Sequence, residues 1–189
     1  MIAYAITDPS TLNFQTLTTD IQCFSTKADM LVYRDKSTHN YAKNAKRFIA
    51  ESKKHNFQKI LLHTDYILAH ELKADGVHLK STQFSDIANA KALGLFVVIS
   101  THTQEEAQKA EALGADMLTF SSIFVSPNKG EPKGVEELKK LISMLSIPVI
   151  ALGGILTEEQ IVLCQKSGAF GFASIRYFSL GSATINTSL

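Results

Sequence analysis

The sequence predicts an α/β protein folded as a single (β/α)8 TIM barrel with a short or truncated last helix. Eight short apolar runs alternate with amphipathic stretches of about ten to fifteen residues, the pattern of repeated strand–helix units around a parallel sheet. The related segments KADMLVY, KADGVHL, GADMLTF and GAFGFAS recur every 41 to 54 residues. Each interval holds two strand–helix units, so four such quarters make one closed barrel.

The predicted strands share a short run of apolar or β-branched residues bounded by turn-forming or charged residues. The eight ranges are Ile2–Thr7, Asp29–Arg34, Lys59–His63, Gly76–Leu79, Phe96–Ser100, Met117–Phe120, Val149–Leu152 and Gly171–Ser174.

Helices are predicted between these strands, for example over Tyr41–Lys54 and Val135–Met144. Two further helices have recognisable starts, since Thr103–Glu106 and Thr157–Gln160 both have the spacing of a capping box. Gly114 is placed as the C-terminal stop of the first of these two helices.

Composition indicates one ordinary globular domain. With 189 residues, 45% of them hydrophobic and 20% charged, the chain can bury a full core. We assign residues 1–180 to the barrel, with a truncated helix after Phe178, and expect residues 181–189 to form a disordered tail. The formal net charge of +1 does not favour a nucleic-acid partner.

Cellular location and cysteine use are also expectations from the sequence. Cys23 and Cys164 lack metal-ligand spacing, so we expect reduced thiols. The start of the chain does not read as a signal peptide, and no run of about 18 apolar residues occurs. We therefore expect a cytoplasmic protein without a membrane partner; its oligomeric state stays open, a homo-oligomer included.

Polar residues follow most of the predicted strands, at the end of the barrel where such folds carry their chemistry. Loops are polar in any protein, so no single residue marks a site, but the set as a whole predicts one. Its members are Asp8, Arg34, Lys36, His63, Thr64, Asp65, His78, Lys80, Ser100, His102, Ser121, Ser122, residues 126–129, Gly153, Gly154 and residues 174–176.

The segment PVIALGGI predicts a phosphate site. Gly153 and Gly154 end a buried strand just before a helix start at Thr157, and without a Cβ their backbone lets a ligand approach closely. Barrels often bind phosphate through the loops after strands 7 and 8. We expect a short helix from Ile175 to add amides and Arg176 to add a charge-assisted contact. The alternatives are a tight turn without ligand and a solvated surface charge.

A second anion site is predicted by the segment YRDKS. Arg34 and Lys36 are two positions apart, so they face the same way into the barrel mouth while strand geometry lasts. Two cations side by side repel each other unless an anion lies between them. Lys129, in the loop FVSPNKGEPKG, is placed to close over the same anion as part of a mobile lid. The alternative for this loop is a flexible surface connector.

Taken in order, the segments YAITD, LVYRDK, ADGVHL, VISTHTQEEAQKAEALGAD, FSSIFVSPNKGEPKG and VIALGGI resemble the thiamine phosphate synthase family, which includes the related thiazole tautomerases. The resemblance runs from about Ala3 to Phe178. It implies a (β/α)8 barrel that joins a hydroxymethylpyrimidine diphosphate to a thiazole phosphate and releases diphosphate with the help of Mg²⁺.

The resemblance also implies roles for individual positions. Arg34, Lys36 and Lys129 match the cations that bind diphosphate, and Ser100 matches a polar residue near the reacting rings. The implied partners are a phosphorylated thiazole and a pyrimidine diphosphate. The predicted substrate-binding residues are Ser126, Gly153, Gly154, Ile155, Ser174, Ile175 and Arg176, the last of which stands where the family has a serine.

The chain departs from the family pattern where metal-binding carboxylates are expected. An Asn–Asp pair is replaced by His63 and Thr64, with Asp65 one step late, and a second aspartate is replaced by Gln83. No protein metal site is therefore predicted, and Mg²⁺ would be held only through a substrate diphosphate.

The tautomerase branch needs no metal, but its catalytic histidine position is Ser122 here, and a serine is a poor base at pH 7. His63 and His102 are the substitute bases, with a structural role as the alternative for each. His78 is expected to point into the barrel rather than into the site. The catalytic candidates are Arg34, Lys36, His63, Ser100, His102, Ser122 and Lys129.

Three functions stay open at this point. The first is an enzyme of thiamine biosynthesis that couples or tautomerises a thiazole phosphate. The second is a non-catalytic binder of thiazole phosphate or thiamine phosphate. The third, ranked last, is a Schiff-base aldolase that uses Lys36 or Lys80, because a lysine nucleophile needs apolar surroundings that neither sequence context offers.

Overall fold

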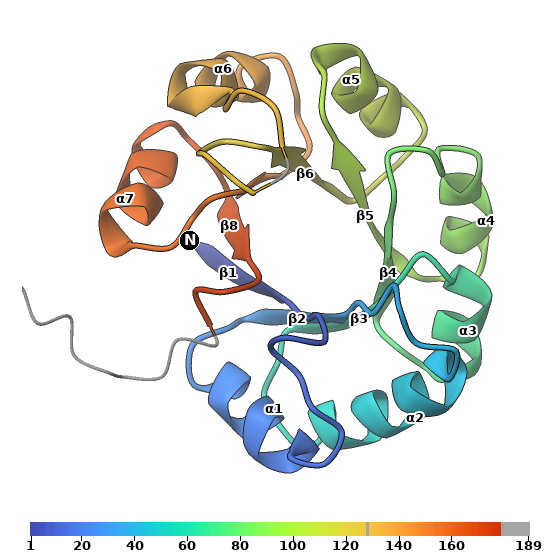
Figure 1. Cartoon of the computed structure of the whole chain (residues 1–189). Coiled ribbons are helices and arrows are strands. Elements are labelled where there is room, and N and C mark those ends of the chain that lie inside the picture. The colour runs from blue at the N-terminus through green and yellow to red at the C-terminus, as the bar shows by residue number, and fades with distance from the viewer. Residues whose placement is uncertain (128, 179–189) are drawn as a thin grey trace, which may run out of the picture.

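The computed structural model describes residues 1–127 and 129–178, and these form a closed barrel of eight parallel strands in sequence order (Figure 1). The predicted barrel is thus confirmed. β8 returns to pair with β1, with Ile2 opposite Gly171 and Ala5 opposite Ser174. The strands are β1 (Ile2–Ile6), β2 (Met30–Tyr33), β3 (Lys59–His63), β4 (Gly76–Leu79), β5 (Phe96–Thr101), β6 (Met117–Ser121), β7 (Val149–Leu152) and β8 (Gly171–Ser174).

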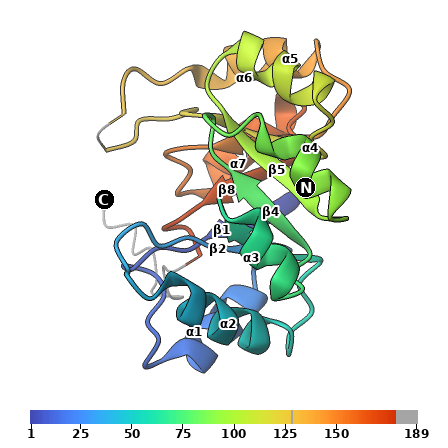
Figure 2. The same ribbon diagram turned by 90° about the vertical axis from the view of Figure 1, so that its right-hand side faces the viewer.

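Helices ring the outside of the sheet (Figures 1 and 2). None of the described helices has the length and apolar character needed to cross a membrane. In the described part of the chain they are α1 (Leu17–Ser25), α2 (Tyr41–Ser52), α3 (Tyr66–Glu71), α4 (Asp86–Ala92), α5 (Gln104–Ala112), α6 (Gly134–Ile142) and α7 (Glu158–Lys166).

Helix starts follow the sequence signals. Thr157 and Gln160 form a complete capping box at the start of α7. Thr103 caps α5 by accepting from the amide of Glu106, while the Glu106 carboxylate accepts from the backbone N–H of His102. The prediction of a short helix from Ile175 is wrong for residues 175–178, because these residues form a bend and a turn. The truncated helix after Phe178 and the tail at 181–189 lie outside the described residues.

The fourfold repeat has a structural cause in its aspartates. In three of the four quarters, the Asp before an even-numbered strand accepts a hydrogen bond from the first part of the preceding strand, which ties neighbouring strands at the base of the barrel. In the fourth quarter Phe170 stands at that position, and its carbonyl accepts from the backbone N–H of Ile2. The three bonds are Ala3 N–H to Asp29 Oδ2 (2.8 Å), Ile60 N–H to Asp75 Oδ2 (2.7 Å) and Val97 N–H to Asp116 Oδ2 (2.7 Å).

The barrel interior is filled by side chains and is not a channel. Strand residues alternate between the interior and the layer under the helices, as the period of two requires. Since the interior is packed, a ligand can bind only at an open end of the barrel. The interior cluster consists of Tyr4, Ile6, Met30, Val32, Leu61, Val98, Met117, Ile150 and Ala173.

Candidate functional site

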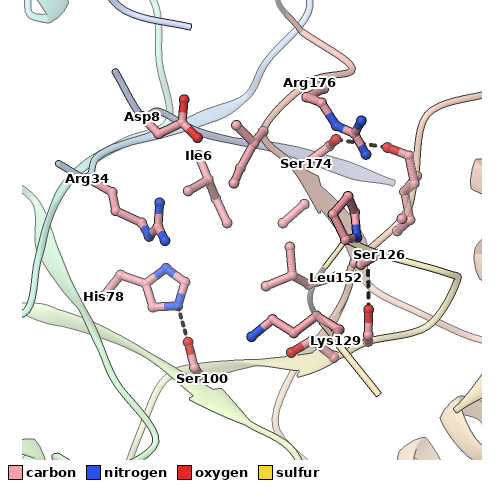
Figure 3. Close-up of a pocket in the computed structure, with 18 of the residues that line it drawn as sticks. Ile6, Asp8, Arg34, His78, Ser100, Ser126, Lys129, Leu152, Ser174 and Arg176 are labelled. Carbon is pink, nitrogen blue, oxygen red and sulfur yellow. Dashed lines mark hydrogen bonds between the residues drawn. The ribbon is translucent and has the colours of Figure 1, made fainter. Parts of the chain in front are cut away.

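A cavity of about 630 Å³ opens at the C-terminal ends of the strands (Figure 3). This volume lies within the usual range for small-molecule sites. All fourteen residues predicted as catalytic or substrate-binding line it. Every strand contributes at its end or in the loop that follows, for example through Ile6, Arg34, His63, His78, Ser100, Ser121, Leu152 and Ser174.

Sequence reasoning missed several lining residues. His78 was expected to point into the barrel rather than into the site, but it occupies the top of the interior and lines the cavity as well. The alternation of side chains along β4 could have predicted this position. It places His78 on the same face of the strand as Gly76, at the end of the strand nearer the cavity. Ile6, Leu152 and Ala173 add the apolar part of the lining.

The cavity is strongly cationic. Arg34, Lys36, Lys80, Lys129 and Arg176 line it. Figure 3 shows Arg34 and Lys129 pointing into the cavity and Arg176 at another edge, beside Ser174. Within the described residues, one carboxylate lines the cavity, that of Asp8 in the loop after β1. The surplus of positive charge suits a ligand with several negative charges.

Four of the cations lie close enough to influence one another. The charge of Arg34, then burial and the charges of Lys129 and Lys80, lower the pKa of Lys36. The cause is like-charge repulsion in the free protein. A bound anion would relieve it. The mobile-lid behaviour of the loop that carries Lys129 stays a prediction.

Two histidines at the cavity floor are neutral at pH 7. Burial first, and then His78 and the cations Arg34, Lys36 and Lys80, lower the pKa of His63 to about 2. Burial and Arg34 lower the pKa of His78 to about 3. The two rings meet edge to face, with centroids 6.0 Å apart.

His78 belongs to a hydrogen-bonded chain across the floor. Its Nδ1 lies 2.9 Å from the hydroxyl oxygen of Tyr4, and its Nε2 lies 3.0 Å from Oγ of Ser100. Burial raises the pKa of Tyr4 well above its usual value, so its hydroxyl stays protonated. A neutral imidazole donates from one nitrogen and accepts at the other, so the tautomer of His78 sets the direction of both bonds.

His63 has no such anchor for its ring. Among the described residues, no group forms a hydrogen bond to the ring nitrogens of His63, whereas its backbone N–H and carbonyl both bond to the hydroxyl of Tyr41 at 3.1 Å. The side chain is 9% exposed and lines the cavity. Its nitrogens are therefore available to a ligand.

His102 and Ser122 are both engaged with the protein. Nδ1 of His102 lies 3.2 Å from the carbonyl oxygen of Ser121 and 3.1 Å from its Oγ. The hydroxyl of Ser122 lies 2.9 Å from Oγ of Ser126 and 3.1 Å from the carbonyl of Phe124. These bonds position the loop after β6, where the Ser121–Ser122 peptide is cis, and none of them activates Ser122 as a base.

The two glycines after β7 are required by the loop after β6. Gly153 and Gly154 adopt φ of +101° and +70°, in the region that favours glycine. A Cβ on Gly153 would lie 2.3 Å from Oγ of Ser122, and a Cβ on Gly154 would lie 2.4 Å from the carbonyl oxygen of Val125. Both glycines also line the cavity, so the phosphate site and the tight turn without ligand both stay predictions.

The corner between β7 and β8 presents backbone to the cavity. Within the described chain, no group accepts a hydrogen bond from the backbone N–H of Gly154 or Ile155. The hydroxyl of Ser174 donates to the carbonyl of Ile155 at 2.8 Å and accepts from the N–H of Tyr177 at 3.2 Å. This bond joins the ends of β7 and β8, so the corner is fixed beside Arg176.

The residues present do not fit a Mg²⁺ site. Among the described residues, no group of three or more His, Cys, Asp or Glu side chains is arranged to hold a metal ion. Thr64 and Gln83 lie in the loops after β3 and β4 and bond to each other, Gln83 Nε2 donating to the carbonyl of Thr64 at 3.1 Å. Asp65 caps α3 instead, accepting from the amide of Leu68 at 2.9 Å.

Comparison with known proteins gives consistent matches over most of the chain. A family model described as thiamine monophosphate synthase matches residues 3–178. A putative thiamine-phosphate synthase 2 of Aquifex aeolicus is 35% identical over 180 residues, which cover 93% of this chain and 96% of the relative. A thiamine-phosphate synthase of Lactococcus lactis is 31% identical over 160 residues, 79% of this chain and 74% of that protein.

A solved structure agrees in fold as well as in sequence. The thiamine phosphate pyrophosphorylase from Pyrococcus furiosus superposes with a TM-score of 0.78 at 26% identity. The superposition covers 92% of this chain and 85% of the other.

Proposed function

Because this chain belongs to the thiamine monophosphate synthase family, and so to the proteins of thiamine biosynthesis, we propose that it joins a pyrimidine diphosphate to a thiazole phosphate. The single observation that carries the proposal is the division of cationic groups between two ends of one cavity. Four cations gather around the ends of β2, β4 and β6, and Arg176 lies at the end of β8. One anionic ligand would use one end only, whereas two phosphorylated substrates would use both.

The thiazole phosphate is assigned to the corner between β7 and β8. The N–H groups of Gly154 and Ile155 lack acceptors within the described residues, and backbone N–H groups of this kind bind phosphate oxygens. Arg176 adds a charge that can contact a phosphate through two nitrogens. The glycine turn holds this corner at a fixed distance from the opposite cations.

The diphosphate is assigned to Arg34, Lys36, Lys80 and Lys129. In the reaction, the thiazole nitrogen forms a bond to the methylene carbon of the pyrimidine while the carbon–oxygen bond to diphosphate breaks. Diphosphate leaves with the electron pair of that bond, so negative charge develops on it. Cations held in place before the reaction stabilise this charge more in the transition state than in the ground state.

The pyrimidine ring is assigned to the cavity floor between these two ends. Ser100 and His78 offer one hydrogen-bonding surface there, and Tyr4 supports His78 from beneath at 2.9 Å. Leu152 and Ala173 supply apolar contact for a ring. Holding both rings at fixed positions lowers the entropic cost of bringing the two reacting atoms together.

A second candidate function, tautomerisation of the thiazole phosphate alone, is favoured by His63. Its ring is neutral and its nitrogens have no hydrogen-bond partner within the described residues, so it can accept a proton from a bound ring. The same lowered pKa makes His63 a weak proton acceptor until a substrate anion offsets the cations beside it. We rank this activity second for that reason.

One experiment separates these functions from a simple binder. Purified protein is incubated with both substrates and, separately, with a thiazole carboxylate phosphate in D₂O, and products are followed by mass spectrometry and proton NMR. Formation of thiamine phosphate supports coupling, and enzyme-dependent deuterium exchange into the thiazole alone supports tautomerisation. Tight binding without either change would support the non-catalytic reading and overturn the proposal.

A further inference from the structure

The loop after β4 carries a lysine into the cavity, and Gln83 in the same loop is bonded within the protein. Oε1 of Gln83 accepts from the backbone N–H of Lys80 at 3.1 Å. Its Nε2 donates to the carbonyl of Thr64 at 3.1 Å and to Oδ2 of Asp86 at 2.9 Å. Gln83 therefore closes the loop, and the side chain of Lys80 lines the cavity.

The carboxylate that lines the cavity uses its Oδ1 in a local turn. Asp8 accepts from the backbone N–H of Ser10 at 2.9 Å and from its hydroxyl at 2.6 Å. On the next loop, Asp35 accepts from the N–H and the hydroxyl of Ser37 at 2.9 and 2.8 Å. Mg²⁺ demands oxygen ligands in near-octahedral order and normally takes one or two carboxylates. The bonds to both residues end on Oδ1, and of the two only Asp8 lines the cavity, so the described residues bring one carboxylate to it.

Positive charge stands around the ends of three neighbouring strands. β3 pairs with β2 on one side and with β4 on the other, so His63 at its end lies between the residues that follow those two strands. Arg34 follows β2 directly and Lys80 follows β4 directly. The repulsion that lowers the pKa of Lys36 has contributions from both of them and from Lys129.

We propose that Arg34, Lys36, Lys80 and Lys129 form a diphosphate subsite that needs no divalent metal ion, with Lys80 supplying the charge that a metal would supply. The four side chains line one cavity and bring four positive charges to a ligand of about three negative charges at neutral pH. Neutral His63 lies at the base of this group and offers a hydrogen bond without adding further repulsion.

This inference rests on the proposed function only for the identity of its ligand, since diphosphate binding can be measured without any coupling reaction. The probe is inorganic diphosphate, titrated by calorimetry into the full chain in EDTA and, separately, in excess Mg²⁺. We expect binding in EDTA, and weaker apparent binding with Mg²⁺ because the metal competes for free diphosphate. Binding that is absent in EDTA, whether or not Mg²⁺ restores it, would overturn the proposal.

The variant that tests the role of Lys80 is Lys80→Met, which keeps an unbranched side chain of similar length and removes its charge. We expect affinity in EDTA to fall about tenfold or more, in line with the loss of one charge-assisted contact. Lys166→Met is the matched control, because Lys166 is an exposed lysine at the C-terminal end of α7, outside the cavity. Unchanged affinity in Lys80→Met would overturn the role of Lys80.

Two further readouts keep the test decisive. A melting temperature for Lys80→Met equal to that of the wild type shows that the fold is intact, and Lys80→Gln serves as a second charge-removing variant if it is not. Diphosphate binding in EDTA without coupling activity would leave the subsite standing and remove the proposed reaction. Coupling activity together with diphosphate binding that strictly requires Mg²⁺ would support the proposed reaction and overturn the metal-free subsite.

Discussion

Nε2 of His78 lies 3.0 Å from Oγ of Ser100, and this contact joins the ends of β4 and β5 at the floor of the cavity (Figure 3). Both residues face the barrel axis, one above the apolar interior and the other beside the mouth. The contact therefore marks the level at which the packed core ends and the ligand site begins.

Stability should fall in acid because of the two buried histidines. An unfolded histidine has a pKa of about 6.5, whereas those of His63 and His78 lie near 2 and 3 in the folded chain. Because the pKa of each histidine is lower in the folded chain, their contribution to the free energy of unfolding is complete above pH 6.5. This contribution is lost as the pH falls below 6.5. Each should remove about 1.4 kcal/mol per pH unit in that range.

Urea unfolding at pH 7, 6, 5 and 4 measures this loss. The variant His78→Gln should reduce the slope of the unfolding free energy against pH by the share of one histidine. It keeps polar atoms near Tyr4 and Ser100. A slope that is the same in wild type and variant would show that His78 does not carry the effect.

Substituting Gly154 should destabilise the fold. Gly154→Ala places a Cβ 2.4 Å from the carbonyl of Val125 at a φ of +70°, so backbone must shift and strain must be accepted. We expect a loss of about 2 kcal/mol or more in the free energy of unfolding. Gly130→Ala is the control, because a Cβ there meets nothing within 4 Å. Equal stability of the two variants would refute the packing argument.

The repeated aspartates should each stabilise the base of the barrel. Asp75→Ala removes the acceptor for the N–H of Ile60, a bond of 2.7 Å, and should cost about 1–3 kcal/mol. Asp75→Asn keeps an oxygen acceptor and should cost less. Chemical denaturation of both variants gives the comparison, and an alanine variant as stable as the asparagine variant would count against the strand tie.

The two ends of the cavity should respond to different substitutions. Arg176→Met should weaken binding of thiazole phosphate about tenfold and leave inorganic diphosphate binding nearly unchanged. Lys36→Met should do the opposite, because Lys36 lies among the cations after β2, β4 and β6. Calorimetry with each ligand measures both effects. Parallel losses for both ligands in both variants would mean that one anion site serves both.

His63 should matter for proton transfer rather than for binding. His63→Asn removes the unpartnered imidazole while leaving the backbone bonds to Tyr41 in place. If the tautomerisation activity exists, deuterium exchange into the thiazole should fall by about 100-fold or more while the affinity for thiazole phosphate stays within about threefold. Exchange that persists in the variant would exclude His63 as the base.

The strands and their polar ends could be predicted because short apolar runs and the residues directly after them are local features. The repeat was also visible in the sequence, but its cause was not. The bond from Ile60 to Asp75 joins residues of neighbouring strand–helix units, which sequence alone does not bring together. The glycine pair showed the limit most clearly. Sequence reasoning connected Gly153 and Gly154 with a ligand, whereas their first requirement comes from Ser122 and Val125, about 30 residues earlier in the chain.

His78 and Gln83 illustrate the same limit within the site. The alternation of side chains along β4 was enough to place His78 inside the barrel. Whether His78 is covered or borders the cavity depends on how far the packed interior side chains reach, which the sequence does not show. Gln83 was recognised as a missing carboxylate, yet its bonds to Thr64 and Asp86 arise only when the loops after β3 and β4 meet. Contacts between loops that are distant in sequence have no local signal.

We propose that one cavity holds two separate anion subsites, and simultaneous binding of both ligands would show that the subsites are distinct. Thiazole phosphate is titrated by calorimetry into protein already saturated with inorganic diphosphate in EDTA. We expect one equivalent of thiazole phosphate to bind with an affinity within about threefold of its affinity for the free protein. Competition, in which saturating diphosphate abolishes thiazole phosphate binding, would contradict it.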